Sequence, residues 1–353
     1  SGPWCGARGP TDLREEPGGD SRVLAADGRP TLGVRQGLGI LLSLAAVAWL
    51  VVTVDWGDVW ASLLRARVTF IALALSLNLA SVGLRAVRWR LLLRRRCGSR
   101  WRRLAAGLLV GQAVNVMVPA RLGDVARATL VCPKDAAFGL GTIVVEGFVD
   151  LLLVAALVLF LFWQVAVPAS WQRAGQGLLG TTGIAVVAMV LLVSARSWVA
   201  KLLEKARARW RHPLVRRVLT ATEELLNSLS IVQRPGQMAW VALSSLAVWA
   251  CYASVNYTLF RAVAVDVPAV AAVFVLVVLQ LGVAVPSSPG RIGVFHYLCM
   301  QVLILFDAVE AKAATYAVLL HLIAVVLPMV LGAILASRFG LTLGRTISGR
   351  EPG

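Results

Sequence analysis

The sequence predicts an all-α polytopic membrane protein with about six full transmembrane helices and two opposed re-entrant helical hairpins, which form an inverted repeat. Its 353 residues are 58% hydrophobic and only 15% charged, and the mean hydropathy is +0.77. Several uncharged apolar runs reach about 18 residues, which is enough to cross a ~30 Å hydrocarbon core. The sequence lacks the ~10-residue alternating segments that a membrane β-barrel requires.

The two ends of the chain differ from this apolar body. Residues 1–35 are rich in Gly, Pro and Arg and hold five arginines against five acids. Such a composition is typical of a disordered segment. We therefore expect a disordered cytoplasmic tail over 1–35, a single transmembrane domain over 36–340, and a second cytoplasmic tail over 341–353.

The charges of the loops orient the chain. Residues 85–103 hold nine arginines and no acid, and residues 196–237 hold nine Lys or Arg against three acids. Because basic loops stay in the cytoplasm, we expect both loops and both termini there, with the protein in the inner membrane of the cell. The apolar segments lie at 37–54, 69–84, 104–118, 121–133, 139–163, 178–195, 238–260, 268–285, 292–306 and 315–337.

This orientation requires a hairpin near Pro119. If residues 104–133 crossed the membrane once, the two most basic loops would face opposite sides. The conflict disappears if 104–118 enters from the cytoplasm, turns at Pro119 and returns through 121–133. Each arm has about 15 residues or fewer, roughly 22 Å of helix, which is short for a crossing.

A second interrupted segment, "LGVAVPSSPGRIGVFHYL", has the same form. An apolar arm leads to Pro286 and a turn rich in Gly, Ser and Pro, and another apolar arm follows. By the count of spans this hairpin enters from outside, whereas the first enters from inside. Paired interrupted segments of opposite entry indicate a transporter binding site.

Residues 196–237 predict a different element. Apolar residues recur at helical spacing with Arg216, Arg217, Glu223 and Glu224 between them. We expect two amphipathic helices at the cytoplasmic surface, inserted into the transmembrane domain.

Two features of composition exclude other classes of protein. The net charge of +17 is concentrated in loops beside apolar segments, so we expect no binding of nucleic acid. The cysteines Cys5, Cys97, Cys132, Cys251 and Cys299 form no CxxC pair and no metal-ligand spacing. The sequence therefore predicts neither a disulfide framework nor a zinc site, and we expect no metal and no cofactor.

Charged residues inside apolar segments mark the candidate site, because charge at the bilayer centre costs roughly 2.5–3.5 kcal/mol. Arg121, Asp124 and Arg127 lie at three-residue spacing after the first turn. A guanidinium can donate two parallel hydrogen bonds to phosphate, so we expect these residues, with Asn115 and Arg291, to bind an anionic headgroup. The alternative is that they extend into water at the interface.

Glu146 and Asp150 lie four residues apart on one face of an apolar segment. We expect them to balance charge or couple protons together with His296, one of them being protonated, and to pair with Arg121. The alternative is that both are ordinary charges at the end of a span.

A polar stripe formed by Asn78, Ser81, Arg85 and Arg88 runs along the second span. We expect the two arginines to contact lipid headgroups or to fix the orientation of the span, and Asn78 to line a cavity. His296 and His321 also lie in apolar segments, where a histidine is more often a structural hydrogen-bond partner than a proton relay.

Three stretches in this order resemble the transmembrane-region family of lysylphosphatidylglycerol synthases, a flippase-like domain that also occurs in stand-alone form. They are "GQAVNVMVPARLGDVARATLV", "VEGFVD" and "VPSSPGRIGVFH", within a similarity that covers about residues 37–340. The chain departs from the family pattern at three positions. Asp124 stands for Glu, which keeps the charge, Gly147 stands for Arg, which removes a possible phosphate ligand, and His296 stands for Glu, which makes any acid role there pH-dependent.

The resemblance implies a role in binding or translocating lipids. We expect a translocator for a lipid with an anionic phospholipid or polyprenyl-phosphate-type headgroup, and not an enzyme. One alternative is an integral-membrane enzyme acting on a lipid phosphate or glycolipid, and another is a non-catalytic partner of a lipid-synthesis enzyme. The sequence leaves the oligomeric state open.

Overall fold

The computed structural model describes residues 34–93, 96–97, 100–117, 121–209, 212–282 and 289–338, and all regular elements within these ranges are helical. The predicted turns at Pro119 and Pro286 lie outside the described residues, as do 1–33 of the expected N-terminal tail and the whole of 341–353.

Five helical segments are long and apolar enough to cross a membrane, so the protein is a multi-pass membrane protein. A sixth span results if the pair formed by α1 and α2, which is bent by 82°, is counted as one. The elements concerned are α1 (Val34–Thr53), α2 (Trp56–Leu64), α3 (Val68–Leu93), α6 (Ala136–Gln164), α7 (Ala169–Ser194), α10 (Pro235–Val263) and the continuous α13 (Glu310–His321), η3 (Leu322–Val326) and α14 (Leu327–Arg338).

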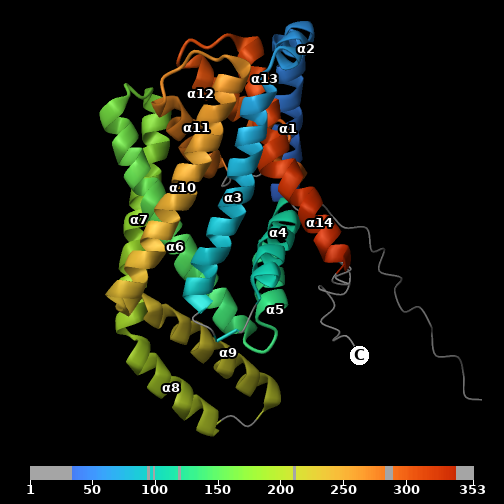
Figure 1. The fold of residues 1–353 in the computed structure, drawn as a ribbon. Coiled ribbons are helices and arrows are strands. Elements are labelled where there is room, and N and C mark those ends of the chain that lie inside the picture. Colours follow the sequence, from blue (N-terminus) through green and yellow to red (C-terminus); the bar gives the residue numbers. More distant parts are fainter. Residues whose placement is uncertain are drawn as a thin grey trace, which may run out of the picture.

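Two pairs of shorter helices correspond to the interrupted segments of the sequence. The first pair is α4 (Trp101–Met117) and α5 (Leu122–Val131), and the second is α11 (Val270–Gly282) and α12 (Val294–Ile304), preceded by the short turn η2 (Pro289–Arg291). In Figure 1 the first pair lies in the lower half of the molecule and the second in the upper half. η2 contacts α4, so the two pairs meet at this point.

The first pair is held together by close approach of its backbones. A Cβ atom on Gly123 would collide with the carbonyl oxygen of Gly111 on the facing helix. The Gly123 amide donates a hydrogen bond of 2.8 Å to Oδ1 of Asn115. Glycine at both positions thus permits the two helices to pack directly against each other.

The predicted amphipathic helices are α8 (Arg196–Arg209) and α9 (Pro213–Leu229), followed by the turn η1 (Ser230–Gln233). Both lie at the lower end of the molecule, beside the C-terminal end of α3 (Figure 1). The C-terminal part of α9 packs on α6, where Ser228 lies directly against Gly141. Its N-terminal part leaves Leu214 and Val218 more than 60% exposed, as expected for a helix at a membrane surface.

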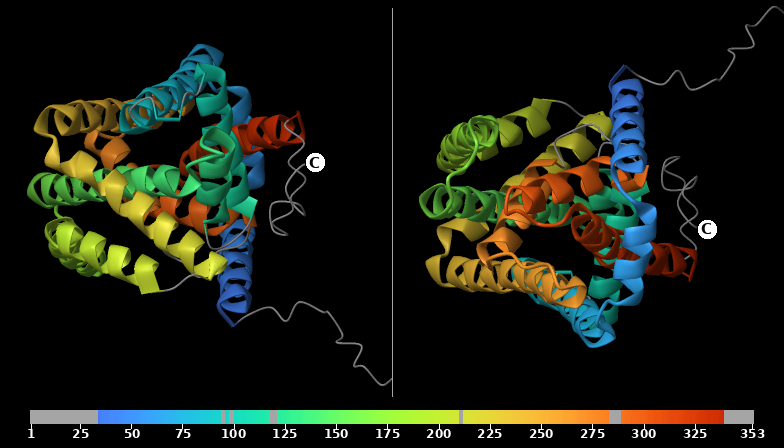
Figure 2. Two further views of the ribbon diagram at one scale, coloured as in Figure 1. Left: turned by 90° about the horizontal axis from the view of Figure 1, so that it is seen from below. Right: turned by 90° about the horizontal axis from the view of Figure 1, so that it is seen from above.

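The long helices differ in how much of their surface they bury. α3 packs most extensively against α10, and both have their buried residues distributed along their length. α7 lies on the outer side of the bundle in both end-on views (Figure 2). Little of its apolar surface is covered by other helices of the protein, as suits a helix that faces lipid.

The last span contains a π-helical turn at η3. The Leu327 amide there donates to the carbonyl of Leu322, five residues earlier. Two neighbouring carbonyls accept side-chain amides instead: Ile323 accepts from Asn78 at 2.8 Å, and Ala324 accepts from Gln112 at 3.3 Å. The π turn therefore joins the last span to α3 and α4.

A disulfide joins Cys97 and Cys132, so the expectation that the sequence forms no disulfide is wrong. The two residues are 35 positions apart in sequence. They come together only when α5 folds back along α4, because Cys97 precedes α4 and Cys132 follows α5. The bond therefore closes the open end of the first helix pair.

Candidate functional site

A cavity of about 360 Å³ lies between the two helix pairs and the long helices α3, α6 and α10. All five predicted headgroup-binding residues line it: Asn115, Arg121, Asp124, Arg127 and Arg291. Glu146 and Asp150 line it too, as do Asn78, Ser81, Arg85 and Arg88 of the polar stripe on α3. The chain thus brings charged residues from α3, α5, α6 and η2 to one place.

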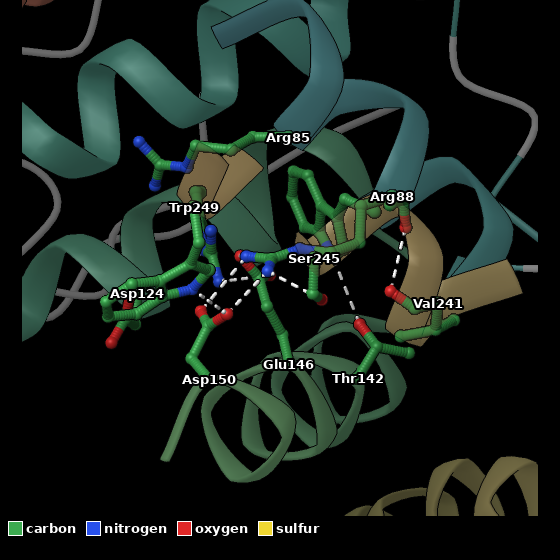
Figure 3. A network of polar contacts seen from close by, with 12 residues as sticks. Arg85, Arg88, Asp124, Thr142, Glu146, Asp150, Val241, Ser245 and Trp249 are labelled. Carbon is green, nitrogen blue, oxygen red and sulfur yellow. Dashed lines mark hydrogen bonds and ion pairs between the residues drawn. The ribbon is translucent and has the colours of Figure 1, made fainter. Parts of the chain in front are cut away.

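Arg88 is the centre of an ion-pair network in the wall of this cavity. It donates to Glu146 at 2.6 Å, to the two oxygens of Asp150 at 2.6 and 3.1 Å, and to the hydroxyl of Ser245 at 3.0 Å. Trp249 also donates to Asp150, at 3.1 Å. Figure 3 shows the Arg88 guanidinium between the two carboxylates.

Arg127 completes the network from the first helix pair. Its Nη2 atom donates to the second oxygen of Glu146 at 3.0 Å, and its Nε atom lies 3.6 Å from Asp124. The guanidinium also stacks over the ring of Trp89, 5.0 Å from the ring centre. Each carboxylate therefore has an arginine partner, which suits three ionised acids and argues against the expected protonated one.

The side chain of Asn115 forms hydrogen bonds with other residues of the site. Its amide group accepts from the Gly123 backbone and donates to Asp124 at 3.3 Å. It thereby fixes the orientation of Asp124 and the start of α5. We assign Asn115 a positioning role on this geometry.

Three arginines of the cavity have no carboxylate partner among the described residues. Arg121 pairs with neither Glu146 nor Asp150, contrary to expectation, because Arg88 and Arg127 occupy both acids. Arg291 lies within electrostatic range of Arg121 and likewise forms no ion pair in the described part of the chain. Arg85 donates only to the neutral amide oxygen of Gln112, at 3.0 Å, and points away from both acids (Figure 3).

Arg121 and Arg291 have the same unusual backbone conformation, with φ of 53° and 58°. Residues other than glycine rarely adopt this left-handed region, and such strain is typical of functional sites. The sequence around them is also shared, since "PARLG" ends at Gly123 and "PGRIG" ends at Gly293. Both glycines lie against a facing backbone carbonyl, that of Gly111 and that of Ser43.

This register differs from the one in which the two expected turns, at Pro119 and Pro286, correspond to each other. The proline that corresponds to Pro119 is Pro289, which places an arginine two residues after the proline in both segments. The shared spacing of proline, arginine and glycine is the signal that could have identified Arg291 and Arg121 as a pair.

His296 does not line the cavity. Its ring lies 4.8 Å from that of His321, and the Nε2 atom of His321 is 2.8 Å from the carbonyl oxygen of Gly290 in η2. His321 thus stabilises η2, the turn that carries Arg291. His296 packs against the ring of His321.

One curated protein that matches the chain is the glycosyltransferase AglD of Haloferax volcanii, with 25% identity over 299 residues. The match covers 73% of this chain but 47% of AglD, so the chain spans about half the length of that relative.

The family comparison covers more of the chain. Residues 36–332 match the model of the lysylphosphatidylglycerol synthase TM region, and this range contains every charged residue of the cavity. The chain therefore belongs to the lysylphosphatidylglycerol synthase transmembrane-region family.

Proposed function

We propose that this protein translocates a lipid with an anionic headgroup between the two leaflets of the inner membrane, and that it is not itself an enzyme. The observation that carries the proposal is the cavity, whose lining includes arginines without acid partners among the described residues. A headgroup enters this polar space while its acyl chains remain in lipid. Intramembrane arginines beside a cavity are typical of such a pathway.

The arrangement of the helix pairs supports a pathway for the headgroup that opens first to one side of the membrane and then to the other. We interpret α4–α5 and α11–α12 as re-entrant hairpins of an inverted repeat, entering from the cytoplasm and from outside. The shared "PARLG" and "PGRIG" sequences, and the location of the two helix pairs in opposite halves of Figure 1, support this interpretation. Alternate exposure of Arg121 and Arg291 would then pass the headgroup from one hairpin to the other.

The name of the relative favours a second candidate, an enzyme acting on a lipid phosphate or glycolipid. AglD is named a glycosyltransferase, and the present chain corresponds to about half of it. Under this alternative the cavity binds the lipid for a reaction. A third role, as the non-catalytic partner of a lipid-synthesis enzyme, requires the lipid to bind without crossing.

Reconstitution into vesicles separates these functions. The purified protein is placed in vesicles containing an anionic phospholipid labelled on one acyl chain, and a membrane-impermeant quencher is added outside. A translocator makes the label of the inner leaflet accessible, so fluorescence falls well below the half that protein-free vesicles retain. Arg121→Gln should slow this loss, because one unpaired guanidinium is removed.

Arg216→Gln is the matched control, because Arg216 is exposed on α9 and lies outside the cavity. It should leave the rate unchanged. Lipid binding without any movement across the bilayer would reject the translocator and favour the partner or enzyme role. Equal slowing by both variants would remove the specific role of Arg121.

A further inference from the structure

We infer that the headgroup bound in the cavity carries two negative charges, as a lipid phosphomonoester or lipid diphosphate does, and not the single charge of a phosphodiester. The inference rests on the proposed function and narrows it to a class of substrate. It follows from the charges that line the cavity and from the way they are paired.

The cavity has an excess of positive charge. Its described lining contains five arginines against three carboxylates, which leaves a net charge of +2. The two neighbouring segments outside the described residues, 118–120 and 283–288, contain no charged residue in the sequence. A bound group with two negative charges would therefore neutralise the site.

The excess is not spread evenly over the lining. The acids Asp124, Glu146 and Asp150 are all joined to Arg88 and Arg127, so this network has three negative charges and two positive ones. The remaining positive charges belong to arginines that lack an acid partner among the described residues. These are Arg85, Arg121 and Arg291.

The unpaired arginines come from three different parts of the fold, namely α3 and the start of the second arm of each helix pair. Their repulsion within one cavity is unfavourable unless an anion lies between them. Each guanidinium has five N–H donors, and in the described part of the protein the bond from Arg85 to Gln112 is the one that uses a donor of these three arginines. Such a surplus of donors suits a group with several acceptor oxygens.

A terminal phosphate fits these requirements better than a phosphodiester. A phosphomonoester carries about −1.5 to −2 charges near neutral pH and presents three strongly accepting oxygens. A phosphodiester carries one charge and presents two free oxygens, which would leave one positive charge of the cavity without compensation. The volume of about 360 Å³ is at the lower end of the range for ligand pockets, so it suits a compact headgroup.

The test compares two lipids that differ only in the headgroup. Phosphatidic acid and phosphatidylglycerol with identical, acyl-labelled chains are offered to the reconstituted full-length protein in separate vesicles. Translocation rates are measured by quenching, and bound lipid is measured by native mass spectrometry of the protein exposed to an equal mixture of both. We expect phosphatidic acid to be bound and moved in preference by about tenfold or more, the effect of one additional charged hydrogen bond.

Arg291→Gln supplies the decisive variant. It should reduce the preference for phosphatidic acid over phosphatidylglycerol by about tenfold, because the excess charge falls by one. Folding should be preserved, since no carboxylate loses its partner, and Arg291→Lys should keep most of the preference because the charge remains. Arg216→Gln on the exposed surface should change neither lipid.

The outcomes separate this inference from the proposed function. Equal handling of both lipids, unchanged by Arg291→Gln, would overturn the doubly charged headgroup while translocation stands. Movement of neither lipid would reject the proposed function itself. Inorganic phosphate serves as the competitor, and displacement of bound phosphatidic acid by it at comparable concentration would overturn the assignment to a lipid.

Discussion

Replacing Arg88 by methionine should destabilise the protein by several kcal/mol. The side chain is 2% exposed and donates four hydrogen bonds, three of them to Glu146 and Asp150. Removing one partner of a buried ion pair costs about 3–5 kcal/mol, because the remaining charge stays buried. Glu146 keeps Arg127 at 3.0 Å and Asp150 keeps Trp249 at 3.1 Å, so we expect the lower part of that range, about 3–4 kcal/mol.

The measurement is the free energy of unfolding in detergent micelles, by titration with a denaturing detergent. Arg96→Ala is the control, because Arg96 pairs with Glu224 at 2.9 Å while its side chain is 42% exposed. An exposed pair contributes at most about 1 kcal/mol. Adding Asp150→Asn to Arg88→Met should recover part of the loss, since the carboxylate that is left without a cationic partner is removed. If Arg88→Met costs no more than Arg96→Ala, then the network is hydrated and our account of it is wrong.

Three further perturbations test the fold. Gly123→Ala should cost about 1–3 kcal/mol in unfolding free energy, because its Cβ meets a carbonyl of the facing helix, whereas Gly147→Ala, with open space around it, should cost little. Cys132→Ser should lower the unfolding free energy by up to about 4 kcal/mol, the chain-entropy value for a loop of 35 residues, and reductant should do the same to the unaltered protein but not to the variant. Single cysteines at the exposed positions Ser197 and Asp58 should react with an impermeant thiol reagent from the cytoplasm and from outside, respectively, and labelling of both from one side would contradict the proposed topology.

The periodicity of the sequence predicted the helical elements well because apolar length and breaks are local properties. The interrupted segments around Pro119 and Pro286 appear as two helix pairs, and the amphipathic stretch appears as α8 and α9. Residues 164–177, which separate two of the predicted apolar segments, are mostly helix, since α7 begins at Ala169 directly after its N-cap residue Pro168. The connection at 55–68 likewise contains α2, which starts where Asp55 accepts the amides of Gly57 and Asp58.

The residues of the candidate site were largely predicted from the sequence, but the ion pairs that they form were not. Glu146 and Asp150 were recognised as one face of a helix, yet their main partner, Arg88, was expected to contact lipid headgroups because it adjoins a basic loop. The two acids are separated from Arg88 by 58 and 62 residues, and no local pattern reports such a contact. The stripe that joins Arg88 to Asn78 and Ser81 was the available signal, since those residues are buried too.

The disulfide was missed for a similar reason. Spacing motifs detect cysteines that lie close together in sequence, whereas Cys97 and Cys132 meet only through the reversal of the chain between α4 and α5. The hairpin predicted around Pro119 nevertheless implies that its two ends, near Cys97 and Cys132, lie close together. The pairing would have followed if that reversal had been applied to the positions of the cysteines.

The π turn in the last span also determines the phase of everything that follows it. A π turn takes about one residue more than an α turn for the same rotation, so a regular α-helix over the same residues would turn α14 by about 100°. Leu331 would then stand where Gly332 now lies against the Leu109 carbonyl of α4, in a contact that leaves no space for a Cβ atom. The Leu327 amide would bond to the Ile323 carbonyl, which now accepts from Asn78, whereas the Ala324 carbonyl would still have no helical donor because Pro328 lacks an N–H group. The wide turn of this short segment is therefore as constrained as the identity of any side chain in the cavity.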